Sequence, residues 1–120
     1  MSRRVLLVEP SAGEASVHQV RLASAGYTVK LVTTATTDGA ARAFSPDIVV
    51  LDVDLLERSG MDVAAWLRSA PATPHLLLVP GDSAPAAPPE PTAAPVAYLA
   101  RPFSPAALVE GVNRYLRQGA

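Results

Sequence analysis

The sequence predicts an α/β domain built on a doubly wound parallel β-sheet, and three features of the chain favour this class. Apolar runs without polar alternation lead into Glu9 and Asp52 and begin again at His75, as in strands that are buried on both faces. Helical patterns alternate with these runs, which is typical of parallel strands joined by crossover helices. A length of 120 residues suits one domain, residues 1–120, with a core of its own.

Five strands are expected, and one of them has a different pattern from the rest. The segment Tyr27–Val32 alternates between apolar and polar residues, which predicts a half-covered or edge strand. The other four are mainly apolar runs, of which those ending near Asp52 and Val79 predict fully buried strands. The predicted strands are residues 4–8, 27–32, 47–52, 75–79 and 96–100.

The first helix is predicted from Ser11 to about Ala25. Its apolar side would consist of Val17, Val20 and Leu22, and Gly26 fits the left-handed position that ends a helix. A further helix is expected from Thr37 or Asp38 to Phe44.

Two later helices carry recognisable start signals. After a loop that follows Asp52, Ser59 and Asp62 resemble a capping box that opens a helix through Arg68, with Trp66 in the core. Ser104 would cap a final helix to about Arg117, which Pro105 starts. The inward residues of the final helix are predicted to be Leu108, Val112, Tyr115 and Leu116.

Half of the twelve prolines lie between Pro80 and Pro95. Each proline inside a helix costs about 3 kcal/mol, so residues 80–95 predict a polyproline-like or disordered connection where a fourth helix would stand. A solvated connector is favoured over a docking ligand for a proline-reading groove. The order of elements then predicts a flavodoxin-like five-stranded sheet.

Composition excludes several functions. A net charge of −1 provides no basic field for nucleic acid, and the absence of cysteine excludes disulfides and thiolate metal sites while agreeing with a cytoplasmic location. The segment Met1–Arg4 leads into a strand too short for a signal core or membrane span. Lys30 is the only lysine.

Two acids mark a candidate site. Glu9 follows the first predicted strand and Asp52 ends the third, so in a parallel sheet both carboxylates would reach the same crevice at the carboxyl ends of the strands. Such a pair suits a metal ion or a phosphoryl group.

The chain resembles the receiver domains of two-component response regulators along essentially its whole length. The resemblance depends on the order and spacing of Val5–Glu9, Pro46–Asp52, Ser59–Gly60, Thr73–Pro74 and Tyr98–Phe103. It implies that Asp52 is the phosphoacceptor for a histidine kinase, with Mg²⁺ bound beside it. It also implies that Glu9 and the backbone carbonyl of Asp54 are metal ligands, and that the Arg101–Pro102 peptide bond is cis.

Three residues depart from the receiver pattern. Pro10 replaces the second acid of the metal-binding pair, and Val79 replaces the hydroxyl residue at the end of the fourth strand. Arg101 replaces the lysine, and we expect it to pair with Asp52. Since Mg²⁺ requires near-octahedral oxygen coordination, these changes predict a weak or absent Mg²⁺ site and a degenerate, pseudo-receiver domain.

Several residues keep alternative interpretations. Glu9 is either a charge or metal partner or a solvated strand end, and Asp54 is more simply an exposed loop acid than a side-chain metal ligand. Tyr98 matches the aromatic residue of the family's fifth strand, but Val79 favours a packing role for it. We expect His18 and His75 to be surface or core residues rather than ligands.

The favoured function is therefore a non-enzymatic module of two-component signalling that acts by protein–protein contact without phosphorylation. The alternative is a functional phosphoacceptor receiver, modified on Asp52 with weak Mg²⁺ dependence. A flavin or nucleotide binder is disfavoured because residues 9–14 lack a phosphate cradle. Expected partners are a histidine kinase, a downstream effector or a second copy of the chain, with no nucleic acid or membrane. With no DNA-binding segment after Ala120, the output is expected in a partner or in sequence beyond this chain.

Overall fold

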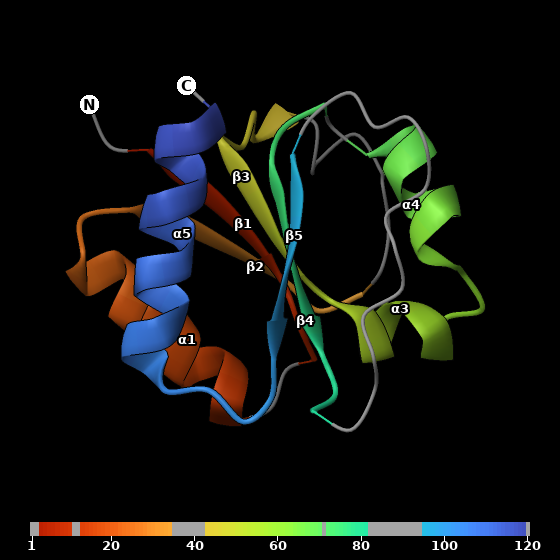
Figure 1. The fold of residues 1–120 in the computed structure, drawn as a ribbon, viewed down its shortest axis with the longest axis horizontal. Coiled ribbons are helices and arrows are strands. Elements are labelled where there is room, and N and C mark those ends of the chain that lie inside the picture. Colours follow the sequence, from red (N-terminus) through yellow and green to blue (C-terminus); the bar gives the residue numbers. More distant parts are fainter. Residues whose placement is uncertain (1–2, 11–12, 35–42, 71, 82–94, 120) are drawn as a thin grey trace.

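A computed structural model describes residues 3–10, 13–34, 43–70, 72–81 and 95–119. Its centre is a five-stranded sheet in the order β2-β1-β3-β4-β5, and every neighbouring pair is parallel (Figure 1). This is the predicted flavodoxin-like arrangement. The strands are β1 Arg4–Val8, β2 Thr28–Val32, β3 Ile48–Asp52, β4 His75–Val79 and β5 Val96–Ala100. The helices are α1 Gly13–Ser24, α3 Val53–Arg58, α4 Val63–Ser69 and α5 Pro105–Gly119.

Helices cover both faces of the sheet. In Figure 1, α1 and α5 lie on one side and α3 and α4 on the other. Because successive strand residues point to opposite faces, Leu6 and Leu51 contribute to the core under α3 and α4, while Leu7 and Val50 pack in the core under α1 and α5. The central strands β1, β3 and β4 are almost wholly buried, which explains their unbroken apolar runs.

The edge strands and the last helix agree with the sequence prediction. All residues of β2 and β5 are exposed or only partly buried, as the alternation of residues 27–32 indicates for β2. At α5 the Ser104 hydroxyl accepts a hydrogen bond from the backbone N–H of Ala107 at 3.0 Å, which confirms the predicted cap. The inward side of α5 consists of Leu108, Val112 and Leu116, with Tyr115 partly buried beside them.

The predicted apolar side of α1 is wrong at two positions. Val17 is 48% exposed and Val20 is 62% exposed, whereas Ala15, His18 and Leu22 are buried. The reason is the helical period. Residues three or four apart share a face, while residues two apart, such as Val20 and Leu22, point to nearly opposite sides. A buried histidine thus occupies a place that the sequence analysis assigned to valine.

The segment after Asp52 is also corrected. Residues 53–58, predicted as a loop, form the short helix α3, with Asp52 as its N-cap. The capping box at Ser59 is absent because Asp62 itself caps α4, accepting a hydrogen bond from the N–H of Ala65 at 2.7 Å. Trp66 on α4 is fully buried, as predicted.

Two predictions lie outside the described residues. The first is the helix expected from Thr37 or Asp38 to Phe44, of which residues up to 42 are not described. The second is the Pro-rich connection, of which residues 82–94 are not described. Within the part of the chain that the structure covers, no helix is long and apolar enough to cross a membrane.

Candidate functional site

The carboxyl ends of β1 and β3 bring Glu9 and Asp52 to one crevice. The two strands are hydrogen-bonded neighbours with Val8 paired to Leu51, so the residue after each of these lies at the same edge of the sheet. Both acids are buried: Glu9 is 1% exposed and Asp52 is 6% exposed. Buried carboxylates need partners, and the structure provides them from three other elements.

The two carboxylate oxygens of Asp52 have different partners. Oδ1 accepts hydrogen bonds from the backbone N–H groups of Asp54 at 2.9 Å and Leu55 at 3.3 Å, which makes Asp52 the N-cap of α3. Oδ2 accepts a longer hydrogen bond, 3.4 Å, from Nη2 of Arg101. The helix therefore orients the carboxylate and leaves one oxygen facing the crevice.

Arg101 is the cation at the centre of the site. Its Nε and Nη2 atoms both donate to Oε1 of Glu14, at 3.1 and 2.9 Å. Nη2 also lies 3.7 Å from Oε2 of Glu9, in addition to its contact with Asp52. The guanidinium carbon lies 5.6 Å from the ring centroid of Phe103, a cation–π contact. One guanidinium thus interacts with three carboxylates, and the predicted Arg101–Asp52 contact is the second shortest.

Glu9 is paired with a histidine. Nδ1 of His18 lies 2.6 Å from Oε1 of Glu9, and both side chains are almost completely buried. The imidazole stacks on the ring of Phe103, with centroids 5.3 Å apart. Of the two interpretations that the sequence left for Glu9, the structure shows a charge partner rather than a solvated strand end.

Asp54 lies away from the crevice contacts. Its carboxylate forms an exposed ion pair with Arg58 at 2.7 Å, one turn along α3, in agreement with an exposed acid. Its backbone carbonyl, the metal ligand that the resemblance implies, belongs to the first turn of α3 rather than to a loop. Lys30 is exposed on β2, on the far side of β1 from Asp52.

Two residues around the site pack in the core, and for Tyr98 this role was predicted. Val79 is buried in the core under α3 and α4, and Tyr98 packs against the same cluster. Desolvation raises the pKa of Tyr98. The Arg101–Pro102 peptide bond is cis, as the resemblance implies.

His75 has a structural role under the opposite helix layer. Its Nε2 accepts a hydrogen bond from the Trp66 indole at 3.1 Å, and its Nδ1 donates to the carbonyl of Thr73 at 2.7 Å. Desolvation by burial lowers the pKa of His75, with the bond to Thr73 acting in the opposite direction. His75 is a core residue, as predicted.

The sequence analysis missed two members of the site, Glu14 and His18. A signal was present, because the two residues are four apart on α1 and therefore lie on the same face of the helix. What the sequence did not reveal is that this face points at the strand ends.

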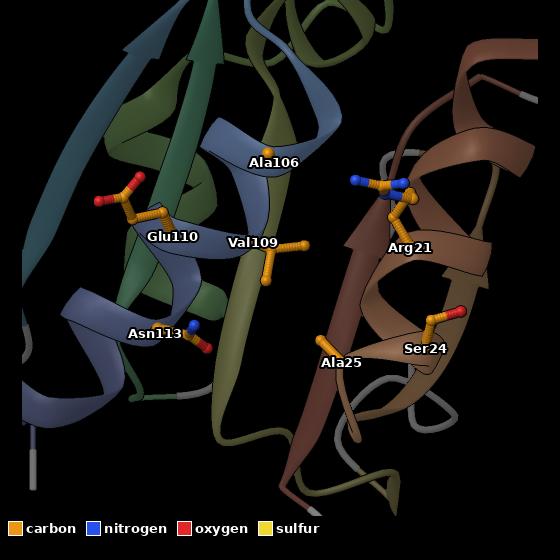
Figure 2. Close-up of a pocket in the computed structure, with 7 residues that line it drawn as sticks. All are labelled: Arg21, Ser24, Ala25, Ala106, Val109, Glu110 and Asn113. Atoms are coloured by element: carbon orange, nitrogen blue, oxygen red, sulfur yellow. The ribbon is translucent and has the colours of Figure 1, made fainter.

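A second hollow lies between α1 and α5, with a volume of about 430 Å³ (Figure 2). Its only ionisable lining groups are Arg21 and Glu110, and it brings no acids together, unlike the strand-end crevice. It is lined by Arg21, Ser24, Ala25, Ala106, Val109, Glu110 and Asn113.

Comparison with solved structures identifies the architecture. The response regulator receiver domain protein (CheY-like) from Methanospirillum hungatei JF-1 superposes with a TM-score of 0.71 over 99% of this chain and 97% of its own, at 20% sequence identity. This chain has the receiver-domain fold. The signal receiver domain of a signal transduction histidine kinase from Syntrophus aciditrophicus gives a TM-score of 0.68 at 25% identity, covering 98% and 92% of the two chains.

A third solved structure is similar to this chain to the same degree. It is the N-terminal domain of a response regulator/sensory box/GGDEF 3-domain protein from Carboxydothermus hydrogenoformans, with a TM-score of 0.71, 24% identity and coverage of 97% and 95%. By sequence, neither a protein-family model nor a curated protein matches the chain. The likeness is therefore one of fold, and the chemistry of the receiver site has to be judged from its residues.

The donor set of this receiver site fits Mg²⁺ poorly. Mg²⁺ requires oxygen ligands in near-octahedral geometry at about 2.0–2.1 Å. Pro10 offers no side-chain oxygen, and the Asp54 carboxylate is paired with Arg58. The free oxygens of Glu9 and Asp52 both face the guanidinium of Arg101, at 3.7 and 3.4 Å. A permanent positive charge thus stands beside the two remaining ligands.

Proposed function

We propose that this chain is an atypical receiver domain of two-component signalling that acts by contact with other signalling proteins, without phosphorylation of Asp52. The observation that carries the proposal is the position of Arg101, whose guanidinium interacts with Glu9, Glu14 and Asp52 at 3.7, 2.9 and 3.4 Å. The guanidinium stays protonated at any physiological pH, so it neutralises the acids without a metal ion.

The surroundings of Asp52 support one stable state of the domain. One carboxylate oxygen caps α3 and the other faces Arg101, so phosphorylation would disturb both contacts. The side chain of Val79 has no hydroxyl with which to bind a phosphoryl oxygen. Phosphoryl transfer depends on positioning and on charge stabilisation, and this site has few donors for either.

The proposed role is binding, with a histidine kinase, a downstream effector or a second copy of the chain as partner. A net charge of −1 argues against nucleic acid as a direct partner. A cytoplasmic location is part of the proposal, and the absence of cysteine agrees with such a reducing compartment. The surfaces proposed for contact are α5, the edge strand β5 and the Pro-rich connection, of which residues 82–94 lie outside the described residues.

The alternative function is a working phosphoacceptor with weak Mg²⁺ dependence. One observation favours it: among the described residues, Oδ2 of Asp52 has only the 3.4 Å contact with Arg101. That oxygen could attack the phosphorus of a donor, forming the acyl phosphate as the bond from phosphorus to the leaving group breaks.

The test is intact mass spectrometry after incubation of the full chain with Mg²⁺ and acetyl phosphate. We expect no gain of a phosphoryl group in the parent chain, in Asp52→Asn or in Glu57→Gln, a control in an exposed acid of α3. Far-ultraviolet circular dichroism checks that each variant is folded. One added phosphoryl group in the parent and in Glu57→Gln, but not in Asp52→Asn, would overturn the proposal in favour of the alternative.

A further inference from the structure

The buried ring of His18 has one nitrogen, Nε2, that the proposed receiver function does not use. It is 3% exposed, and its Nδ1 lies 2.6 Å from Oε1 of Glu9. A carboxylate oxygen accepts hydrogen bonds, so Nδ1 is the ring nitrogen that donates to Glu9, and Nε2 is the nitrogen left for another contact. Among the described residues no hydrogen bond reaches Nε2, and its nearest acidic neighbour is Oε1 of Glu14, 3.9 Å away.

The arrangement is that of a metal-binding histidine with its supporting carboxylate. Histidine ligands almost always donate the other ring N–H to a carboxylate or carbonyl, which fixes the tautomer and the ring orientation. Glu9 does this for His18, and the stacked ring of Phe103 adds to the orientation. The 3.9 Å between Nε2 and Oε1 of Glu14 is a suitable separation for two ligands that each lie about 2.0–2.2 Å from one ion.

We propose that His18, Glu14 and Glu9 form a binding site for a divalent transition-metal ion of the Zn²⁺ class. One ligand atom from each of the three residues lies within 4.8 Å of the others. Nε2 of His18 and the carboxylate of Glu14 bind the ion directly, while Glu9 orients the imidazole through its contact with Nδ1. Imidazole combined with carboxylate selects Zn²⁺, Co²⁺ or Ni²⁺ over Mg²⁺, which prefers oxygen ligands alone.

The site has an approach from solvent. Glu14, Val17 and His18 on α1 line a hollow of about 310 Å³, which Arg101, Phe103 and Pro105 close on the other side. The Glu14 side chain is 52% exposed, so water can complete the coordination of an ion. This site uses the face of α1 rather than Asp52, and it is separate from the acceptor position of the fold.

Arg101 is the competitor of the ion. Its Nη2 donates to the same Glu14 oxygen at 2.9 Å, so the ion binds when the guanidinium turns aside. The Arg101 side chain is 27% exposed, and its pair with the half-exposed Glu14 is the type of ion pair that solvent weakens. Removing the guanidinium should therefore strengthen metal binding.

The test is titration of the untagged full chain with Co²⁺, followed by its visible absorption, and then displacement by Zn²⁺. We expect one ion per chain, and weakening by at least about tenfold in Glu14→Gln, which removes a ligand from a half-exposed position and leaves the buried pair intact. Glu57→Gln, an exposed acid on α3, is the matched control and should bind as the parent does. Arg101→Gln should bind more tightly.

Two further variants separate this site from other cation sites. His18→Gln, checked for folding by circular dichroism, should lose the nitrogen contribution to the Co²⁺ spectrum, and Asp52→Asn should retain it. Absence of any Co²⁺ spectrum in the parent would overturn the proposal. So would equal weakening by Glu14→Gln and Glu57→Gln, or loss of binding in Asp52→Asn with binding kept in Glu14→Gln.

Discussion

Arg101 shows how one residue changes the chemistry of a receiver crevice. Arginine presents a planar fork of donors, and here Nε and Nη2 both bind Glu14 while Nη2 also faces Glu9 and Asp52. A lysine ammonium is a compact point charge and could not donate to Glu14 through two nitrogens at a fixed angle. The acid that Arg101 contacts most closely, Glu14, lies on α1 rather than at a strand end.

His75 provides a pH prediction. Burial lowers its pKa from 6.5, so the unfolded chain binds a proton at a higher pH than the folded chain does. The stability that depends on neutral His75 is therefore fully present above pH 6.5 and is lost as the pH falls through the folded-state value. The slope in that window is at most about 1.4 kcal/mol per pH unit for one group.

Urea unfolding of the parent and of His75→Gln at about pH 7.5 and about pH 5 measures this effect. Glutamine can keep both hydrogen bonds, to Trp66 and Thr73, but does not titrate. We expect the free energy of unfolding of the parent to fall more steeply toward low pH than that of the variant. All other residues are the same in both chains, so the difference between the curves isolates His75, and parallel curves would contradict the prediction.

At the level of elements, two aspartates decide where helices begin. Asp52 begins α3 with two backbone hydrogen bonds, although Gly60, two residues after that helix, and Ser59 made the segment resemble a loop. Asp62 begins α4 three residues beyond the predicted start at Ser59. Both are N-cap residues in extended backbone, where a carboxylate accepts the N–H groups that the first turn leaves unpaired.

Substitution of the two α4 start candidates tests the cap assignment. Asp62→Ala should lower the free energy of unfolding by about 1 kcal/mol, because the Ala65 N–H loses its 2.7 Å partner. Ser59→Ala should change it by less than about 0.5 kcal/mol, since its hydroxyl only donates to the carbonyl of Leu55 at an exposed site. Denaturant titration of both variants checks this, and a larger loss at Ser59 would restore the capping-box assignment.

At the level of the whole molecule, the strand order assembles the site. Glu9 and Asp52 come from adjacent strands, whereas Arg101 follows β5, two strands beyond β3. The N–H of Arg101 binds the carbonyl of Val79 at 2.9 Å, which continues the β4–β5 pairing beyond the end of β5. Gly81 passes close to this junction, and a β-carbon there would lie 1.8 Å from the Arg101 carbonyl oxygen.

Gly81→Ala should therefore force the two strand ends apart. Since the contact is with backbone and cannot move aside as a flexible side chain would, we expect a loss of about 1–3 kcal/mol in the free energy of unfolding. Gly13→Ala is the matched control: nothing lies within 4 Å of its added carbon at the start of α1, so its stability should be unchanged or slightly higher. Urea unfolding compares the two, and equal stability for both variants would contradict the close approach.

The sequence by itself determined the centre of the sheet, because the continuous apolar runs of β1, β3 and β4 are typical of parallel strands that are buried on both faces. The alternating pattern of residues 27–32 determined the edge strand β2. It also determined that Glu9 and Asp52 meet, since adjacent parallel strands end at one edge. Local polar residues predicted the helix starts less well. The start of α3 and the cap of α4 depend on which nearby side chain accepts hydrogen bonds from the unpaired backbone N–H groups of the first helical turn.

Only the tertiary structure decided the partners of those acids. The rotation of α1 on the sheet buries His18 and exposes Val17 and Val20, although hydrophobicity alone favoured the reverse. A buried histidine is stable there because Glu9, nine residues earlier, accepts a hydrogen bond from its Nδ1. Phe103, from a distant part of the chain, stacks on its ring. The contacts of Glu14 with Arg101, 87 residues apart, arise from the same packing of α1 against the end of β5.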